Sequence, residues 1–161
     1  MRLQLHVPIA APLVLGLLLL VLAMAMPADG ASADYADRRA ALIDEVRAQG
    51  LADGPPGFDK AVLQALLRVE RHEFVPASQR ASAYRNHPLP IGHGQTISQP
   101  YIVALMTDLL EAEADDVVLE VGTGSGYQAA VLAEIVDTVF TIEIVPELAS
   151  QARERLRRLG Y

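Results

Sequence analysis

The chain has 161 residues, which suffice for one domain of ordinary size. It has no cysteine, which excludes a disulfide framework, and its net charge of −7 without a dense basic patch argues against nucleic-acid binding. Arg2 and Asp29 cancel, so all of this net charge arises after residue 33.

The first 33 residues have the pattern of a secretory leader. Arg2 precedes an uncharged apolar run from Val7 to Met26, and ASA at 31–33 offers small residues around a cleavage point. We predict that residues 1–33 are a signal peptide and that the protein is exported to the periplasm. An uncleaved membrane anchor is an alternative, because the run is close to the ~20 residues that span a bilayer. A buried core helix is a third.

The next segments predict an N-terminal helical part. Residues 34–49 have apolar residues at helical spacing, and Gly50 is the predicted stop. Asp59 is expected to open a second helix that runs to about Val69. From 77 to 99 the chain is polar and rich in glycine and proline, which predicts irregular loop.

The rest of the chain predicts an α/β arrangement. Ser98 is the predicted N-cap of a helix that begins near Pro100. A strand at 116–122, a helix from 125, a strand at 138–144 and a helix from 146 then follow. This order indicates a parallel βαβ unit.

The first strand-to-helix turn, LEVGTGSGYQ, has glycines at 122, 124 and 126, and Glu120 lies two residues before the first of them. Glycines permit positive φ angles and let a ligand approach the backbone. The dinucleotide fingerprint is G-x-G-x-x-G, whereas this chain has G-x-G-x-G beside an acid. A carboxylate there suits a cationic ligand such as S-adenosylmethionine better than a pyrophosphate. Glu143, which ends the second strand, is the predicted acceptor for ribose hydroxyls. A purely structural turn is the alternative.

Two long blocks closely resemble one known family. They are LPIGHGQTISQPYIVALMTDLL and VLEVGTGSGYQAAVLA, supported by RVERHEFVP and IEIVPELASQARERLRRLG. The chain thereby resembles the protein-L-isoaspartate (D-aspartate) O-methyltransferases over about residues 37–160. The GQTISQP block is specific to that family, whereas the glycine motif is shared among class I methyltransferases.

The resemblance implies an α/β class I S-adenosylmethionine-dependent methyltransferase fold, Rossmann-like, with an N-terminal helical subdomain. Residues 34–99 would hold the N-terminal helices and substrate loop, and residues 100–161 the first part of the cofactor-binding domain. The implied cofactor is S-adenosylmethionine. Its predicted contacts are Glu120, Gly122, Thr123, Gly124, Gly126 and Glu143.

The implied reaction transfers a methyl group to the free carboxylate of L-isoaspartyl residues in damaged proteins. A carboxylate is ionised at neutral pH, so the site needs no general base and must bind an anion without quenching it. Neutral hydroxyls suit this task. Ser98 matches the active-site serine of the family, and Thr96 is the second predicted catalytic residue. The implied partners are isoaspartate-containing proteins or peptides, and we expect a monomer with no metal site.

The chain departs from the family pattern in two respects. It ends at Tyr161, so the expected fold is truncated after the second strand–helix unit, and the G-D-G and D-x-I-x-V segments are absent. We expect the apolar sheet faces to lie open and the polypeptide alone to be poorly folded and inactive. The leader is unusual because S-adenosylmethionine is made in the cytoplasm, where most of the family works, so a cytoplasmic location is an alternative. Alternatives to repair activity are a non-catalytic membrane-anchored fragment and a class I methyltransferase with another substrate.

Overall fold

The computed structural model describes residues 28–53 and 57–161, with side-chain environments from Asp34 onward. Residues 34–161 form one of two units and hold every predicted site residue. The apolar run of the predicted leader lies outside the described residues. Within the described ranges, no helix is long and apolar enough to cross a membrane.

The N-terminal part is helical, as predicted, but its first helix does not stop at Gly50. Helix α1 (Ala28–Asp53) runs past this residue, where a Cβ atom would lie 2.8 Å from the Phe58 ring. Gly50 therefore serves close packing rather than helix termination. Helix α2 (Lys60–Arg68) opens at Asp59 as predicted, because the Asp59 side chain accepts a hydrogen bond from the Ala61 N–H at 2.6 Å.

The segment predicted as irregular loop is more ordered than expected. After the 3-10 helix η1 (Arg71–Phe74) come a second 3-10 helix, η2 (Ala77–Ser82), and an antiparallel hairpin of β1 (Leu89–Gly92) and β2 (Gln95–Ile97). Its turn consists of three residues with positive φ, Gly92, His93 and Gly94. Gln95–Ile97 of the motif GQTIS therefore form the returning strand of a hairpin, and Ser98 follows that strand directly.

Helix α3 (Pro100–Leu109) begins where predicted, but Ser98 does not cap it. The N-cap residue is Gln99, which makes no side-chain capping bond. Pro100 has no N–H, and the next free donor, the Tyr101 N–H, binds the Asn86 side-chain oxygen at 3.0 Å. A side chain distant in sequence thus caps this helix, and the Ser98 hydroxyl has no capping role.

The predicted βαβ unit is confirmed. Strands β3 (Val117–Val121) and β4 (Thr138–Ile142) are parallel, in a register that pairs Glu120 with Thr141. Helix α4 (Tyr127–Ala133) connects them, and α5 (Pro146–Leu159) follows and ends at Gly160 in the left-handed conformation. Gly126 also has positive φ, and a Cβ atom there would lie 3.2 Å from Leu156 of α5.

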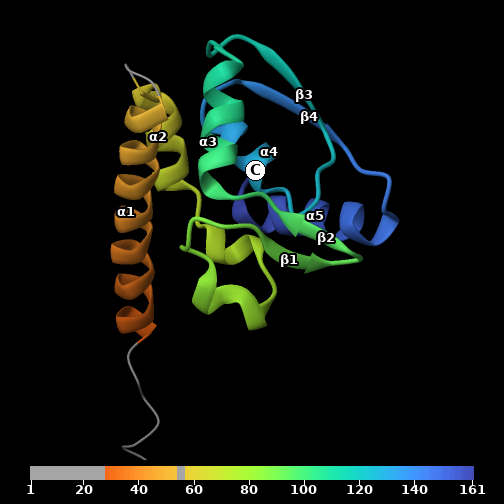
Figure 1. Cartoon of the computed structure of the whole chain (residues 1–161). Helices are drawn as coiled ribbons and strands as arrows, with labels where there is room; N and C mark the ends of the chain where they lie inside the picture. The colour runs from red at the N-terminus through yellow and green to blue at the C-terminus, as the bar shows by residue number, and fades with distance from the viewer. Residues whose placement is uncertain (1–27, 54–56) are drawn as a thin grey trace, which may run out of the picture. The chain divides into compact units, whose positions relative to one another are not determined.

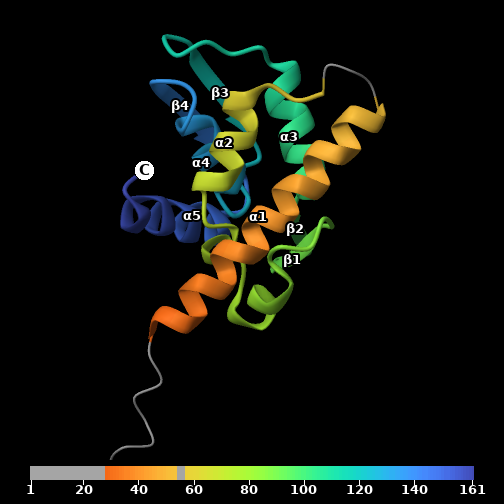
Figure 2. The same cartoon turned by 90° about the vertical axis from the view of Figure 1, so that its left-hand side faces the viewer.

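Helix α4 packs against β3 and β4, and α2 packs against α3 and α4 (Figures 1 and 2). One continuous core joins α1, α2, the hairpin and α4. The opposite face of the β3–β4 pair is open. Its apolar side chains are more than half exposed: Val117, Leu119, Val121, Phe140 and Ile142. The expectation of uncovered apolar sheet surface agrees with this exposure.

Candidate functional site

The hairpin, α3 and the glycine turn enclose a groove of about 440 Å³. Thr96 and Ser98 line it from the hairpin side. Glu120, Gly122, Thr123 and Gly124 line it from the end of β3 and the turn. Both predicted substrate residues and four of the six predicted cofactor residues thus face one cavity. Gly126 and Glu143 do not line it.

Direct packing holds the two sides of the groove together. A Cβ atom on Gly124 would lie 3.5 Å from the Ile91 side chain of β1, and Ile91 itself is buried. The alternation of the hairpin then exposes Thr96 of β2 while Ile97 is buried. The same strand pattern that anchors the hairpin to the core therefore presents Thr96 at the surface.

Glu120 lies in a confined, hydroxyl-lined environment. The Thr141 hydroxyl donates a hydrogen bond to its carboxylate, and the hydroxyls of Thr123 and Thr141 are 2.6 Å apart. Burial raises the pKa of Glu120 to about 7, and the negative charge of Glu143 adds to this rise. The hydrogen bond from Thr141 opposes it. Glu120 is therefore only partly ionised at neutral pH in the absence of a cation.

The pKa of Glu143 is shifted in the opposite direction to that of Glu120. The backbone N–H groups of Val145 and Gly124 donate to its two carboxylate oxygens at 3.0 and 2.7 Å, and these bonds lower its pKa. Each oxygen keeps a further acceptor position. Glu143 lines a neighbouring cavity of about 710 Å³ between β4 and α5, and Thr123 lines both cavities. Its predicted contact with ribose hydroxyls stays a prediction.

The glycine turn offers acceptors and space rather than free N–H donors. The N–H groups of Gly122 and Thr123 both donate to Ile142 O, and that of Gly124 donates to Glu143. The Gly126 N–H donates to Thr123 O. A phosphate cradle needs such groups free. Beyond Gly122 and its two neighbours along the chain, no atom lies within 4 Å of a Cβ position built at Gly122. Carboxylates beside open space fit a ligand with positive charge and hydroxyl donors, as S-adenosylmethionine has, better than a pyrophosphate.

Three contacts that support the site were not predicted from the sequence. Thr141 binds Glu120 through the parallel register of β3 and β4. Arg71 donates to the Ser98 carbonyl at 2.8 Å, and Asn86 caps α3. Thr141 could have been found by aligning the two predicted strands. No local sequence signal marks the other two.

Two further residues near the motifs have defined positions. Tyr127 is buried at the start of α4, with its ring 5.5 Å from that of Phe74, and it also lines the groove. His93 lies exposed at the tip of the hairpin. Among the described residues, no three His, Asp or Glu side chains gather as they would around a metal ion.

Comparison with known proteins gives consistent results. The family model for protein-L-isoaspartate(D-aspartate) O-methyltransferase (PCMT) matches residues 37–161. A protein-L-isoaspartate O-methyltransferase 2 of Syntrophobacter fumaroxidans is 54% identical over 154 residues, which cover 91% of this chain and 62% of the relative. One of Polaromonas sp. is 60% identical over 121 residues, which cover 75% and 56%. The chain thus spans little more than half the length of these curated relatives.

Solved structures are similar as well. One protein-L-isoaspartate O-methyltransferase superposes with a TM-score of 0.66 at 26% identity, over 76% of this chain and 39% of the other. A second, a protein-L-isoaspartate O-methyltransferase from Plasmodium falciparum in complex with S-adenosyl-L-homocysteine, gives 0.61 at 25% identity, over 74% and 55%.

Proposed function

Since the chain belongs to the protein-L-isoaspartate (D-aspartate) O-methyltransferase family, we propose that it acts in methyl transfer from S-adenosylmethionine to the free carboxylate of L-isoaspartyl residues in damaged proteins. The observation that carries this proposal is the shared groove. Thr96 and Ser98 line it opposite Glu120 and the glycine turn. It combines a neutral hydroxyl wall for an anion with an acidic wall for a cation.

Each wall has a distinct task in this proposal. S-adenosylmethionine, when bound, supplies an electrophilic methyl group on a positively charged sulfur. Glu120 lines the groove and holds its amino group. Glu143, in the neighbouring cavity that shares Thr123 with the groove, holds its ribose hydroxyls, and the glycines leave room for it. Ser98 and Thr96 donate hydrogen bonds to the substrate carboxylate, which orients the anion without a competing ion pair. No side chain has to remove a proton, because the carboxylate is already ionised.

Methyl transfer to an isoaspartyl peptide tests the proposal. The 161-residue chain and a chimera that continues into the remaining part of the Syntrophobacter relative are mixed with methyl-labelled S-adenosylmethionine and the peptide, and volatile labelled methanol is counted. The same peptide with a normal aspartyl linkage is the control. We expect label from the isoaspartyl peptide alone. No transfer by either protein would contradict repair activity.

Two results would favour the alternatives. Transfer by the chimera but not by the chain would support a chain that cannot catalyse by itself. Transfer of label to the aspartyl control, or to other acceptors only, would favour a class I methyltransferase with a different substrate. The partners proposed are isoaspartate-containing proteins.

Export through residues 1–33 is a further proposal, supported by the uncharged run between Val7 and Met26. An epitope tag at the C-terminus and cell fractionation test it. Cleavage near Ala33 with recovery outside the inner membrane is expected for a signal peptide. Retention of the full mass in the membrane would indicate an anchor, and recovery with cytoplasmic proteins would contradict export.

A further inference from the structure

Arg71 is a buried cation next to the proposed substrate wall. It is the first residue of η1, and it is 0% exposed. Burial lowers the pKa of its guanidinium below the ordinary value, yet an arginine side chain stays charged in proteins. Over the described ranges, none of the ion pairs involves Arg71. A buried charge without a counter-ion costs free energy. Hydrogen bonds and other polar contacts must therefore stabilise the guanidinium.

Those contacts gather backbone carbonyls from separate segments. Arg71 Nε donates to Ala83 O at 2.9 Å, and Nη2 donates to Ser98 O at 2.8 Å and to His87 O at 3.5 Å. The guanidinium carbon lies 4.9 Å from the centroid of the Tyr127 ring. Tyr127 is the first residue of α4 and follows the glycine turn. One side chain therefore joins the end of the hairpin to the start of the cofactor-side helix.

We propose that Arg71 is a positioning residue for Ser98, an inference that rests on the proposed function. The guanidinium fixes the Ser98 carbonyl. In a trans peptide plane the following N–H, that of Gln99, then points the opposite way. The Ser98 residue itself is exposed and lines the groove. Arg71 thus sets the orientation of the substrate wall relative to Tyr127 and the turn.

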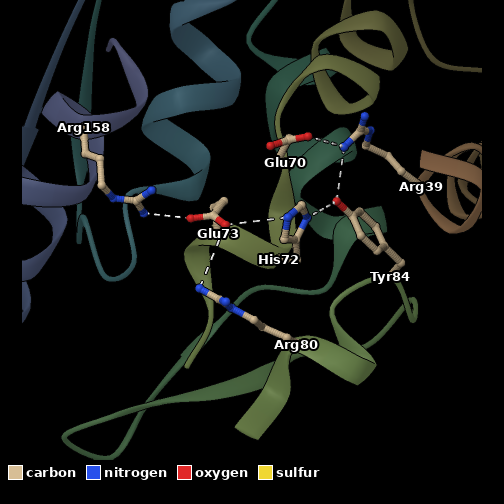
Figure 3. A network of polar contacts seen from close by, with 7 residues as sticks. All are labelled: Arg39, Glu70, His72, Glu73, Arg80, Tyr84 and Arg158. Atoms are coloured by element: carbon tan, nitrogen blue, oxygen red, sulfur yellow. Dashed lines mark hydrogen bonds and ion pairs between the residues drawn. The ribbon is translucent and has the colours of Figure 1, made fainter. Parts of the chain in front are cut away.

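Arg39 provides a matched control. Its side chain is also largely buried, at 15% exposed, and it donates to the Tyr84 hydroxyl at 3.3 Å and to Glu70 at 3.4 Å. Figure 3 shows this network, which continues through His72. Two of its members, Glu70 and His72, are the sequence neighbours of Arg71, but no member of the network lines the groove.

The test compares Arg71→Lys and Arg71→Met with Arg39→Met in the full chain and, for the kinetics, also in the Syntrophobacter chimera. The measurements are hydrogen exchange of the backbone amides from Thr96 to Tyr101, the Kd for S-adenosylhomocysteine, and kcat and KM with an isoaspartyl peptide. Loss of a bond from a charged donor is expected to raise this local exchange and to lower kcat about tenfold or more, with Kd changed less than about threefold. Arg71→Lys keeps the positive charge, so its amide exchange at residues 96–101 and its kcat are both expected to lie between those of wild type and Arg71→Met.

A solely structural role predicts a general rise in exchange across the core and similar effects of Arg39→Met, and this result would overturn the proposal. Wild-type exchange at residues 96–101 in folded Arg71→Met, or a wild-type kcat, would also overturn it. If Arg71→Met does not fold, the amide exchange at residues 96–101 and the kcat of Arg71→Lys test the proposal instead. Absence of methyl transfer by both the wild-type chain and the chimera would contradict the proposed function, while the exchange data would still decide the positioning role.

Discussion

Two carboxylates at the ends of neighbouring strands have opposite electrostatic environments. Two backbone N–H groups keep Glu143 ionised, whereas burial raises the pKa of Glu120 from 4.5 to about 7. Divergent pKa values of this kind are typical of functional sites. A cationic ligand at the turn would favour the ionised form of Glu120, so ligand affinity is expected to increase as the pH rises through 7.

The raised pKa of Glu120 also predicts how stability depends on pH. Because the folded-state pKa exceeds the unfolded value, the folded state holds the proton more tightly. The stabilisation is complete below the unfolded pKa and is lost as the pH rises towards 7, by on the order of 3 kcal/mol. We expect Glu120→Gln to remove this fall, as measured by urea unfolding from about pH 4 to about pH 8.

Thr141→Val is the companion variant for this measurement. It removes the hydroxyl that donates to Glu120 and opposes the rise in pKa. The fall in stability should therefore extend to higher pH in Thr141→Val. Identical pH profiles for wild type and Glu120→Gln would show that Glu120 has an ordinary pKa.

At the scale of elements, Asn86, which caps α3, and Ser98, which does not, should affect different properties of the protein. Asn86 contributes to stability, and Ser98 contributes to methyl transfer. Asn86 accepts from the Tyr101 N–H and donates to Gln49 of α1 at 3.1 Å. Asn86→Ala is expected to lower the free energy of unfolding by about 1–2 kcal/mol. Ser98→Ala should leave it within about 0.5 kcal/mol but reduce methyl transfer. Denaturant midpoints and methanol release measure the two quantities. Equal destabilisation by both substitutions would show that Ser98 has a structural role after all.

The elements that the sequence predicted well are those with a strong local period. Strands β3 and β4 and helices α2 and α5 follow from apolar spacing, and the acid–glycine pattern placed Glu120 at the groove. The hairpin was missed because its strands have four and three residues, too few for an alternating pattern, and one contains Pro90. The roles of Asn86 and Arg71 arise from contacts between distant segments, which no local pattern encodes.

At the scale of the whole described unit, the open face of the β3–β4 pair is the main exposed apolar surface. Leu119 and Phe140 are register partners on this face and are 62% and 60% exposed. Contiguous exposed apolar surface of this kind is unusual in monomeric soluble proteins and binds apolar dyes or partners. We therefore expect this face to bind an apolar dye.

The double substitution Leu119→Thr with Phe140→Thr tests this. Threonine keeps the preference for strand and removes apolar area, so binding of the dye ANS should fall, while the free energy of unfolding changes by less than about 1 kcal/mol because both side chains are already exposed. Val131→Thr is the matched control, since Val131 is fully buried in α4 and should lose stability instead. Unchanged dye binding in the double variant would place the dye elsewhere. If the additional part of the longer relatives covers this face, the Syntrophobacter chimera should lose dye binding without any substitution.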